Sequence, residues 1–207
     1  MLTSTPNKKD IESAHERILS FIHETPVLTS ELLNKQVGCE LHFKCENFQK
    51  VGAFKYRGAT NAILQLTKEE LEKGVATHSS GNHGQALAKA AQIIKSKAYI
   101  VMPNNAPKVK IEAVKGYGAE VIFCEPTLEA RETTLQKVID QTGATFIHPY
   151  NNYEVIAGQA TCAKDLINQV EDLQIILAPV GGGGLLSGTL LSAHYFAPNI
   201  EVWAGEP

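Results

Sequence analysis

The stretch VATHSSGNHGQALAKAAQIIKSKAYIVMP, residues 75–103, decides the fold class. VATHS predicts a strand, QALAKAAQIIK a helix and AYIVMP a second strand. Because the second strand is almost continuously apolar, we expect it to be covered on both faces, as in a parallel sheet flanked by helices. The stretch therefore predicts a βαβ unit and an α/β fold.

The same alternation of strands and helices continues on both sides of this unit. A helix is predicted over about 128–141, and strands in the segments ELHFKCE (40–46), AEVIFC, GATFIHPY, LQIILAPV and EVWAGEP. Near the N-terminus, Asp10 is expected to cap a helix, and Thr67 and Glu70 form a capping box for another. Parallel sheets covered by helices are therefore expected throughout the chain.

The spacing of these elements also predicts a domain organisation. The βα units are densest between residues 74 and 151, which indicates a small inserted α/β domain. Residues 1–73 and 152–207 then form a larger domain. Because EVWAGEP ends like a strand in the middle of a sheet, we expect this larger domain to be incomplete at its C-terminus.

Composition and charge exclude several function classes. The 207 residues are 43% hydrophobic and 20% charged, with a net charge of −3 and no basic stripe, so a nucleic-acid partner is not expected. The first residues lack the apolar core of a signal peptide, and no apolar run is long enough to span a bilayer. The four cysteines are scattered, which is typical of a reducing compartment. We expect a cytoplasmic protein that does not bind membranes.

A run of four glycines, residues 181–184, joins the apolar segment LQIILAPV to a helical pattern. Bare backbone at a helix start presents N–H groups to a phosphate, and a simple turn needs fewer glycines. The run does not complete a dinucleotide fingerprint, because the third glycine position falls on Ser187. Glu201 and Glu206 lie near the distance expected for a ribose-binding acid. A nicotinamide or nucleotide site therefore stays open beside a simpler phosphate site.

A second strand-to-helix turn, THSSGNHGQA at 77–86, could hold an anion. Its serine hydroxyls, amide and imidazole add side-chain donors to the backbone amides, which suits a carboxylate or a phosphate. The alternative is a capping serine followed by ordinary polar loop residues. The pattern alone does not separate the two.

The stretch GAFKYRGA, residues 52–59, places Lys55 and Arg57 among small residues. Near a helix start, in a cavity cleared by Gly52 and Gly58, burial would lower the pKa of Lys55 and supply the neutral amine that imine chemistry needs. The alternative is a solvated helix lysine, which would leave the small neighbours unexplained. For Arg57 we expect a structural pair with an acid. An imine-forming lysine, a phosphate site and a carboxylate site together suit pyridoxal phosphate and an amino acid.

Four segments carry a resemblance to a known family. KCENFQKVGAFKYRGA, THSSGNHGQALAKAA, HPYNNYEVIAGQ and APVGGGGLLSG resemble the serine racemase and serine/threonine dehydratase family, in order and with matching spacing from about Ile18 to Pro207. The resemblance implies the tryptophan-synthase-β-like fold, with two doubly wound parallel-sheet domains.

The resemblance also implies roles for single residues. Lys55 carries pyridoxal 5'-phosphate covalently and acts as base on one face of the substrate α carbon, and Ser80 acts on the opposite face. Bacterial threonine dehydratases have alanine at the position of Ser80, so SSGNH favours the racemase-like branch. Phe54 flanks the cofactor ring and Asn82 bonds its 3'-oxygen. The phosphate is held by Gly181, Gly182, Gly183, Gly184 and the amide of Leu185, and the substrate carboxylate by Ser79, Asn82 and His83.

The function expected first is β-elimination from L-threonine or L-serine to a 2-keto acid and ammonia, the reaction of a dehydratase. Racemisation of serine by Lys55 and Ser80 comes second, because both reactions share one carbanion. Serine, threonine and 3-hydroxyaspartate stay open as substrates. A non-catalytic fragment that folds with a partner chain, or a nucleotide-binding Rossmann-like protein, is the alternative of another class.

The resemblance extends to partners and metals. We expect a homodimer, and Tyr150 stands where racemases have an asparagine that contacts the cofactor. Glu206 matches a ligand of a divalent cation such as Mg²⁺, with a solvated strand-end acid as the equal alternative. Glu31 replaces a serine in the nucleotide site, so we expect weak or absent ATP activation. The other positions of that site are Ser30, Lys50, Gln85 and Tyr117.

Overall fold

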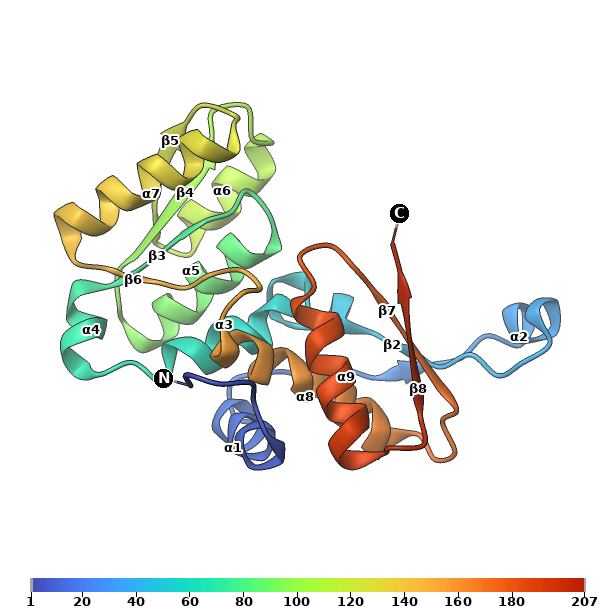
Figure 1. Ribbon diagram of the computed structural model, residues 1–207. Helices are drawn as coiled ribbons and strands as arrows, with labels where there is room; N and C mark the ends of the chain where they lie inside the picture. The colour runs from blue at the N-terminus through green and yellow to red at the C-terminus, as the bar shows by residue number, and fades with distance from the viewer. Residues whose placement is uncertain (1, 207) are drawn as a thin grey trace.

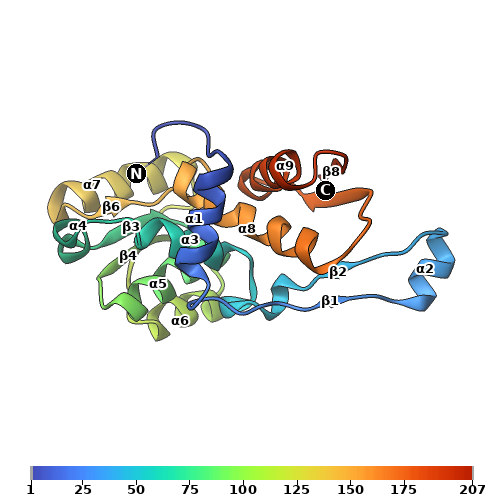
Figure 2. The ribbon, with the colours of Figure 1, turned by 90° about the horizontal axis from the view of Figure 1, so that it is seen from below.

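The structure, a computed structural model, describes residues 2–206 and confirms the predicted α/β fold (Figure 1). Its central feature is a four-stranded parallel sheet in the order β5–β4–β3–β6. Helices cover both faces, α5 and α6 on one side and α7 on the other (Figure 2). The bounds are β3 Val75–His78, α5 Asn82–Ile94, β4 Ala98–Pro103, α6 Lys108–Gly116, β5 Glu120–Cys124, α7 Leu128–Thr142 and β6 Thr145–Phe146.

Alternating side chains of the central strand supply both faces of this sheet with core residues. Ile100 and Met102 of β4 are fully buried in the cluster that includes α5, whereas Val101 is buried in the cluster that includes α7. Successive strand residues point to opposite faces, so a strand buried on both sides must be apolar throughout. The apolar run AYIVMP therefore gave the correct prediction.

The rest of the chain packs mainly as helices. Helix α8, Tyr153–Gln169, lies against α1 (Lys8–Ile18), α3 (Lys55–Ile63) and α9 (Gly184–Phe196). The parallel pair β7 Ile175–Pro179 and β8 Glu201–Gly205 lies beside α9. The division into an inserted domain and a larger domain stays a prediction.

Two short strands, β1 Val27–Leu28 and β2 Phe43–Lys44, form an antiparallel pair that leads into an arm. The arm ends in α2, Glu31–Val37, and extends away from the body of the molecule (Figure 2). No residue of α2 is buried. The remaining elements are the 3₁₀ turns Glu46–Phe48 and Lys50–Gly52 and helix α4, Lys68–Lys73, which begins with the predicted capping box.

Several predicted element boundaries were wrong. The cap of α1 is Asn7, and Asp10 is the third helical residue, whose carboxylate accepts from the Asn7 N–H at 2.8 Å. The strand predicted over 40–46 contains only β2, because the chain enters a 3₁₀ turn at Glu46. GATFIHPY is extended only through Phe146. Within residues 2–206, one face of strand β7 is open, since Leu177 is 67% exposed.

No helix within residues 2–206 is long and apolar enough to cross a lipid bilayer.

Candidate active site

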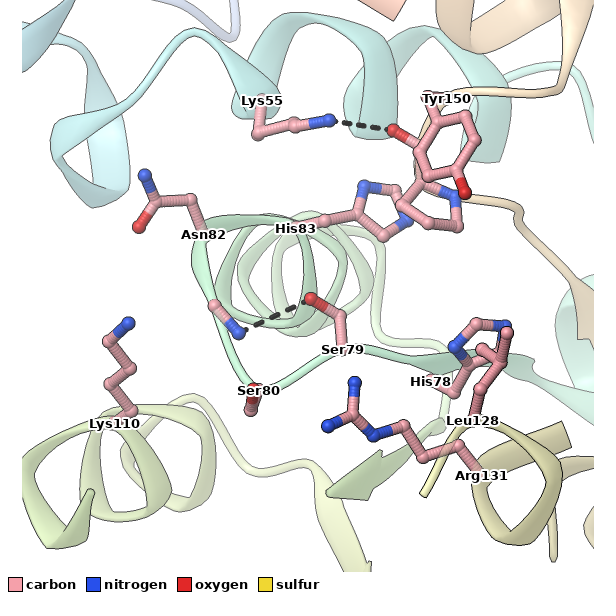
Figure 3. Close-up of a pocket in the computed structure, with 12 residues that line it drawn as sticks. Lys55, His78, Ser79, Ser80, Asn82, His83, Lys110, Leu128, Arg131 and Tyr150 are labelled. Atoms are coloured by element: carbon pink, nitrogen blue, oxygen red, sulfur yellow. Dashed lines mark hydrogen bonds between the residues drawn. The ribbon is translucent and has the colours of Figure 1, made fainter. Parts of the chain in front are cut away.

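A cavity of about 480 Å³ lies beyond the carboxyl end of β3 (Figure 3). Open α/β sheets bind their ligands at this end of the strands, because loops and helix N-termini meet there. Helices α3, α5, α6 and α7 and the turn after β6 contribute its walls. The lining residues are Lys55, His78, Ser79, Ser80, Gly81, Asn82, His83, Lys110, Leu128, Arg131, Pro149 and Tyr150.

Lys55 is the first residue of α3 and enters the cavity without an acidic partner. Its Nζ donates to the carbonyl oxygen of Pro149 at 2.8 Å and lies 5.3 Å from the centre of the Phe54 ring. Burial lowers the pKa of Lys55 from 10.5 to about 8. Among the described residues, Lys55 makes no salt bridge. A minor but useful fraction of this amine is therefore neutral at physiological pH.

The small residues around Lys55 have a different cause from the one that the sequence suggested. A Cβ on Gly58 would lie 2.7 Å from the carbonyl oxygen of Val155 on α8, and Ala59 is fully buried. Gly52 has φ +69° in a turn, with no other chain atom closer than 3.9 Å to an added Cβ. Gly58 thus permits close helix packing, and Gly52 a left-handed turn. Neither clears space for a ligand.

The turn between β3 and α5 forms the side of the cavity opposite Lys55. Helix α5 begins at Asn82, so the amides of its first turn have no partner within the helix. Ser79 Oγ accepts from the Gly81 N–H at 3.3 Å. Ser80 belongs to the same turn and also lines the cavity (Figure 3). The wall therefore combines bare amides with two hydroxyl groups.

The imidazole of His83 is not arranged as a donor to the substrate carboxylate, which was its expected role. Its ring is buried, and Nε2 donates to the Ile147 carbonyl oxygen at 3.0 Å. Burial lowers the pKa of His83 to about 3, so the ring is neutral and its Nδ1 can only accept. Nδ1 has no partner among the described residues. A carboxylate in this cavity could use the backbone N–H of His83 but no imidazole donor.

The glycine run, residues 181–184, lies next to the cavity, because it packs against Tyr150, which lines the cavity. Gly183 has φ +83°, which favours glycine, and α9 begins directly after it. A Cβ on Gly182 would overlap the Tyr150 ring, which also lines the cavity. Leu185 and Phe54 line a neighbouring cavity of about 430 Å³. The predicted phosphate site thus lies next to the wall that Lys55 contacts.

These residues fit pyridoxal phosphate. Positions Gly181 and Gly183 have no atom within 4 Å of an added Cβ, so the loop is open where bare amides would meet a phosphate. Lys55 supplies an amine that has no acidic partner among the described residues and could react with the aldehyde. The donor set therefore matches both reactive ends of the cofactor.

Other predicted residues lie outside this cavity. Glu206 follows β8 and is exposed, and residues 2–206 contain no group of three or more histidine, cysteine and acidic residues suited to a metal. The Ser30 hydroxyl caps α2, and Tyr117 contacts the ammonium of Lys89. The metal site and the nucleotide site stay predictions.

Sequence reasoning did not find the cationic part of the cavity. Lys110 of α6 and Arg131 of α7 come from helices that are far apart in sequence from Lys55. Arg131 Nε is buried and has no partner within the described residues. The two side chains meet at the same cavity only because α6 and α7 pack on opposite faces of one sheet. No local sequence motif therefore predicts them.

Comparison with known proteins shows the family of this chain. A family model described as pyridoxal-phosphate dependent enzyme matches residues 18–207. A serine racemase from Dictyostelium discoideum is 55% identical over 99% of this chain and 63% of its own length, and its crystal structure, of which 66% is covered, superposes with a TM-score of 0.95. A beta-hydroxyaspartate dehydratase from Paracoccus denitrificans is 50% identical over 98% of this chain and 64% of its own length. The chain thus spans less than two thirds of these relatives.

Proposed function

The chain belongs to the family of pyridoxal-phosphate dependent enzymes, and we propose that it racemises serine with Lys55 and Ser80 as its two proton-transfer groups. One observation carries the proposal: a partly neutral amine from α3 and a hydroxyl from the turn between β3 and α5 line one cavity (Figure 3). The most similar relatives named above support racemisation at least as well as elimination. We therefore place racemisation first and reverse the order that the sequence suggested.

The cavity residues would divide the binding of cofactor and substrate. Lys55 would hold the cofactor covalently, residues 181–184 and the amide of Leu185 its phosphate, and Asn82 and Phe54 its ring. When bound, the pyridine ring accepts electrons from the substrate and makes the proton on the α carbon acidic. The substrate carboxylate would meet the first-turn amides of α5 and the Ser79 hydroxyl.

Proton transfer would then use both sides of the cavity. Lys55 Nζ takes the α proton on one face, and the Pro149 carbonyl orients the amine through its hydrogen bond. Ser80 Oγ delivers a proton to the same carbon on the other face. Lys110 lines the same cavity, and its positive charge would favour the alkoxide that Ser80 becomes. The reverse reaction exchanges the two roles.

The test is to follow D-serine and keto acid together in wild type and Ser80→Ala. We expect Ser80→Ala to lower D-serine formation by ~100-fold or more, because general acid catalysis on one face is lost. Keto acid formation should persist, since Lys55 still removes the α proton. Ser20→Ala, at an exposed position, is the matched control. Unchanged racemisation in Ser80→Ala would refute the assignment.

A second candidate is elimination from a β-hydroxy amino acid with an acidic side chain. The observation that favours it is Arg131, whose Nε is buried without a partner in the described chain and whose side chain lines the cavity with Lys110. A planar guanidinium suits a second carboxylate. The similarity to a relative named beta-hydroxyaspartate dehydratase also supports an acidic substrate.

This candidate separates from the first by one variant. Arg131→Met should raise KM for 3-hydroxyaspartate by ~10–100-fold, because a charge-assisted hydrogen bond is lost, and leave KM for serine nearly unchanged. Equal changes in KM for both substrates would mean that Arg131 does not bind the side-chain carboxylate of 3-hydroxyaspartate. Elimination from serine or threonine, a homodimer, a cytoplasmic location and weak or absent ATP activation remain predictions.

A further inference from the structure

The turn of residues 148–151 contacts both parts of the proposed cofactor site. It connects β6 to α8, and its Pro149 carbonyl accepts from Lys55 Nζ at 2.8 Å. The ring of Tyr150 lies against Gly182, and its Cβ would be 3.0 Å from a Cβ on Gly184. One short turn thus meets the amine at one end and the glycine run at the other.

His148 holds this turn with a single nitrogen atom. Its Nδ1 accepts from the backbone N–H of Tyr150 at 3.3 Å and from that of Asn151 at 2.9 Å. Its ring also contacts the Tyr150 ring edge-on, with centres 4.6 Å apart. Nδ1 can accept only while it carries no proton, so the ring must be neutral with its proton on Nε2.

The surroundings of His148 keep it neutral. Burial lowers its pKa, and the charges of His78 on β3 and Lys55 on α3 lower it further, whereas Glu132 on α7 opposes them. The neighbouring Arg131 on α7 acts in turn on His78. Phe146 and Tyr150 complete the contacts of the ring. Protonation of Nδ1 on acidification would remove the acceptor from both amides of the turn.

We propose that His148 is a positioning residue for the cofactor site, which acts through Pro149 on Lys55 and through Tyr150 on the glycine run. The inference rests on the proposed function, because it assumes that Lys55 and residues 181–184 hold pyridoxal phosphate. Loss of the acceptor would free the turn and weaken both ends of the site together. His148 touches neither substrate nor cofactor in this account.

The experiment compares two replacements in the protein without cofactor. His148→Asn keeps an oxygen near the place of Nδ1 but cannot titrate, and His148→Leu removes the acceptor. The measurement is the Kd of pyridoxal phosphate against pH, with the protonation of His148 followed by ¹³C NMR. His194→Asn is the control, since His194 is exposed and also contacts a tyrosine ring edge-on, at 4.7 Å.

The expected result is a ratio of Kd values that changes with the protonation of His148. Above its titration, His148→Leu should bind ~10-fold more weakly than wild type, because hydrogen bonds of the turn are lost, and His148→Asn about equally. Below it, wild type should weaken to the level of His148→Leu, while His148→Asn stays ~10-fold tighter. Because variant and wild type are compared at the same pH, the effect of Lys55 titration on Kd cancels in the ratio.

Two outcomes would overturn the inference: a His148→Asn variant that loses affinity with wild type on acidification, or Kd ratios that do not depend on pH. The first outcome is readable even where His148→Leu fails to fold. Failure of the proposed function looks different, because borohydride reduction of wild type with pyridoxal phosphate would then label no Lys55 peptide. Labelled Lys55 with pH-independent ratios refutes the role of His148 alone.

Discussion

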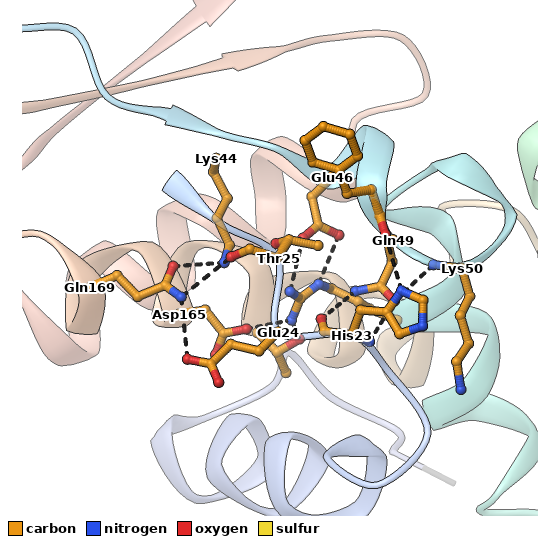
Figure 4. Close-up of polar contacts among 12 residues, drawn as sticks. His23, Glu24, Thr25, Lys44, Glu46, Gln49, Lys50, Asp165 and Gln169 are labelled. Carbon is orange, nitrogen blue, oxygen red and sulfur yellow. Dashed lines mark hydrogen bonds and ion pairs between the residues drawn. The ribbon is translucent and has the colours of Figure 1, made fainter. Parts of the chain in front are cut away.

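Lys55, which is partly buried, and Arg57, which is fully buried, are two cations on one helix with opposite environments. Arg57 is fully buried and donates to both carboxylate oxygens of Glu46, at 2.9 and 2.8 Å, and to Asp165 at 2.7 Å. Glu46 precedes α3 and Asp165 belongs to α8 (both are labelled in Figure 4), so the contacts of Arg57 join these two segments. Among the described residues, Lys55 has one hydrogen-bond partner, the backbone carbonyl of Pro149. Arg57 is thus surrounded by acidic hydrogen-bond partners, whereas Lys55, two residues earlier on α3, has no acidic partner among the described residues.

The comparison shows that acidic partners can oppose the effect of burial on the pKa of a cation. Burial alone would lower the pKa of Arg57, but the hydrogen bonds and charge of Glu46 raise it, with Asp165 contributing. Burial of Lys55, which no acidic partner among the described residues opposes, lowers its pKa to about 8. A paired charge fixes the helix, whereas the unpaired amine can become neutral and react.

The largest expected effect tests whether Lys55 is the reactive amine, and it is an effect on activity. Lys55→Ala should lower the turnover of the complete enzyme by at least ~10⁴-fold, because the base and the point of cofactor attachment disappear together. Steady-state kinetics measure this, and circular dichroism should show an unchanged fold. Lys68→Ala, at a side chain that is 92% exposed, is the control and should keep full activity.

The next effect concerns stability. Arg57→Met should lower the free energy of unfolding by about 3–5 kcal/mol, because Glu46 and Asp165 would stay buried without their partner. Arg57→Lys should lose less, since it keeps the charge but not the bidentate geometry. Urea denaturation measures both. A loss below ~1 kcal/mol for Arg57→Met would contradict the structural role of this network.

Removing the unpaired cation should have the opposite sign. Lys55→Met should stabilise the cofactor-free protein by about 2–3 kcal/mol below pH 8, since protonated Lys55 is costly to bury. A folded-state pKa below the unfolded one means that this gain shrinks as pH rises from about 8 and vanishes above 10.5. Urea denaturation as a function of pH measures it. A destabilised variant would mean that Lys55 is paired after all.

The smallest effect tests whether the two environments are independent. Thr161 Oγ accepts from Arg57 Nη1 at 3.1 Å, so Thr161→Val should cost about 1 kcal/mol of stability. The pH dependence of cofactor attachment at Lys55 should not change, because Thr161 does not line the cavity. A shifted pH profile would show that the network around Arg57 also tunes Lys55.

The same contrast explains how far the sequence could be interpreted. Apolar runs such as AYIVMP and the glycines before α9 carry local signals, so the sheet and the helix start after the glycine run could be predicted. Helix α8 was missed, because its buried face holds polar and small residues such as Gln159 and Gly158 in place of an apolar stripe. The direction of His83 depends on the Ile147 carbonyl, which only the folded chain brings near.

The resemblance predicted Lys55 as the reactive amine, but its surroundings required the structure. The small neighbours Gly58 and Ala59 belong to helix packing, and the feature that prepares the amine is the absence of an acidic partner among the described residues. Neither spacing nor composition shows which partly buried lysine lacks a carboxylate partner. That information depends on contacts between elements far apart in the sequence.

The most direct test of the account is borohydride reduction of the protein with pyridoxal phosphate, followed by peptide mapping of every lysine. We expect one dominant reduced adduct, on the peptide that contains Lys55, with little on Lys110 or on exposed lysines. An adduct mainly at another lysine, or adducts spread evenly over the surface, would contradict the claim that this unpaired buried amine holds the cofactor.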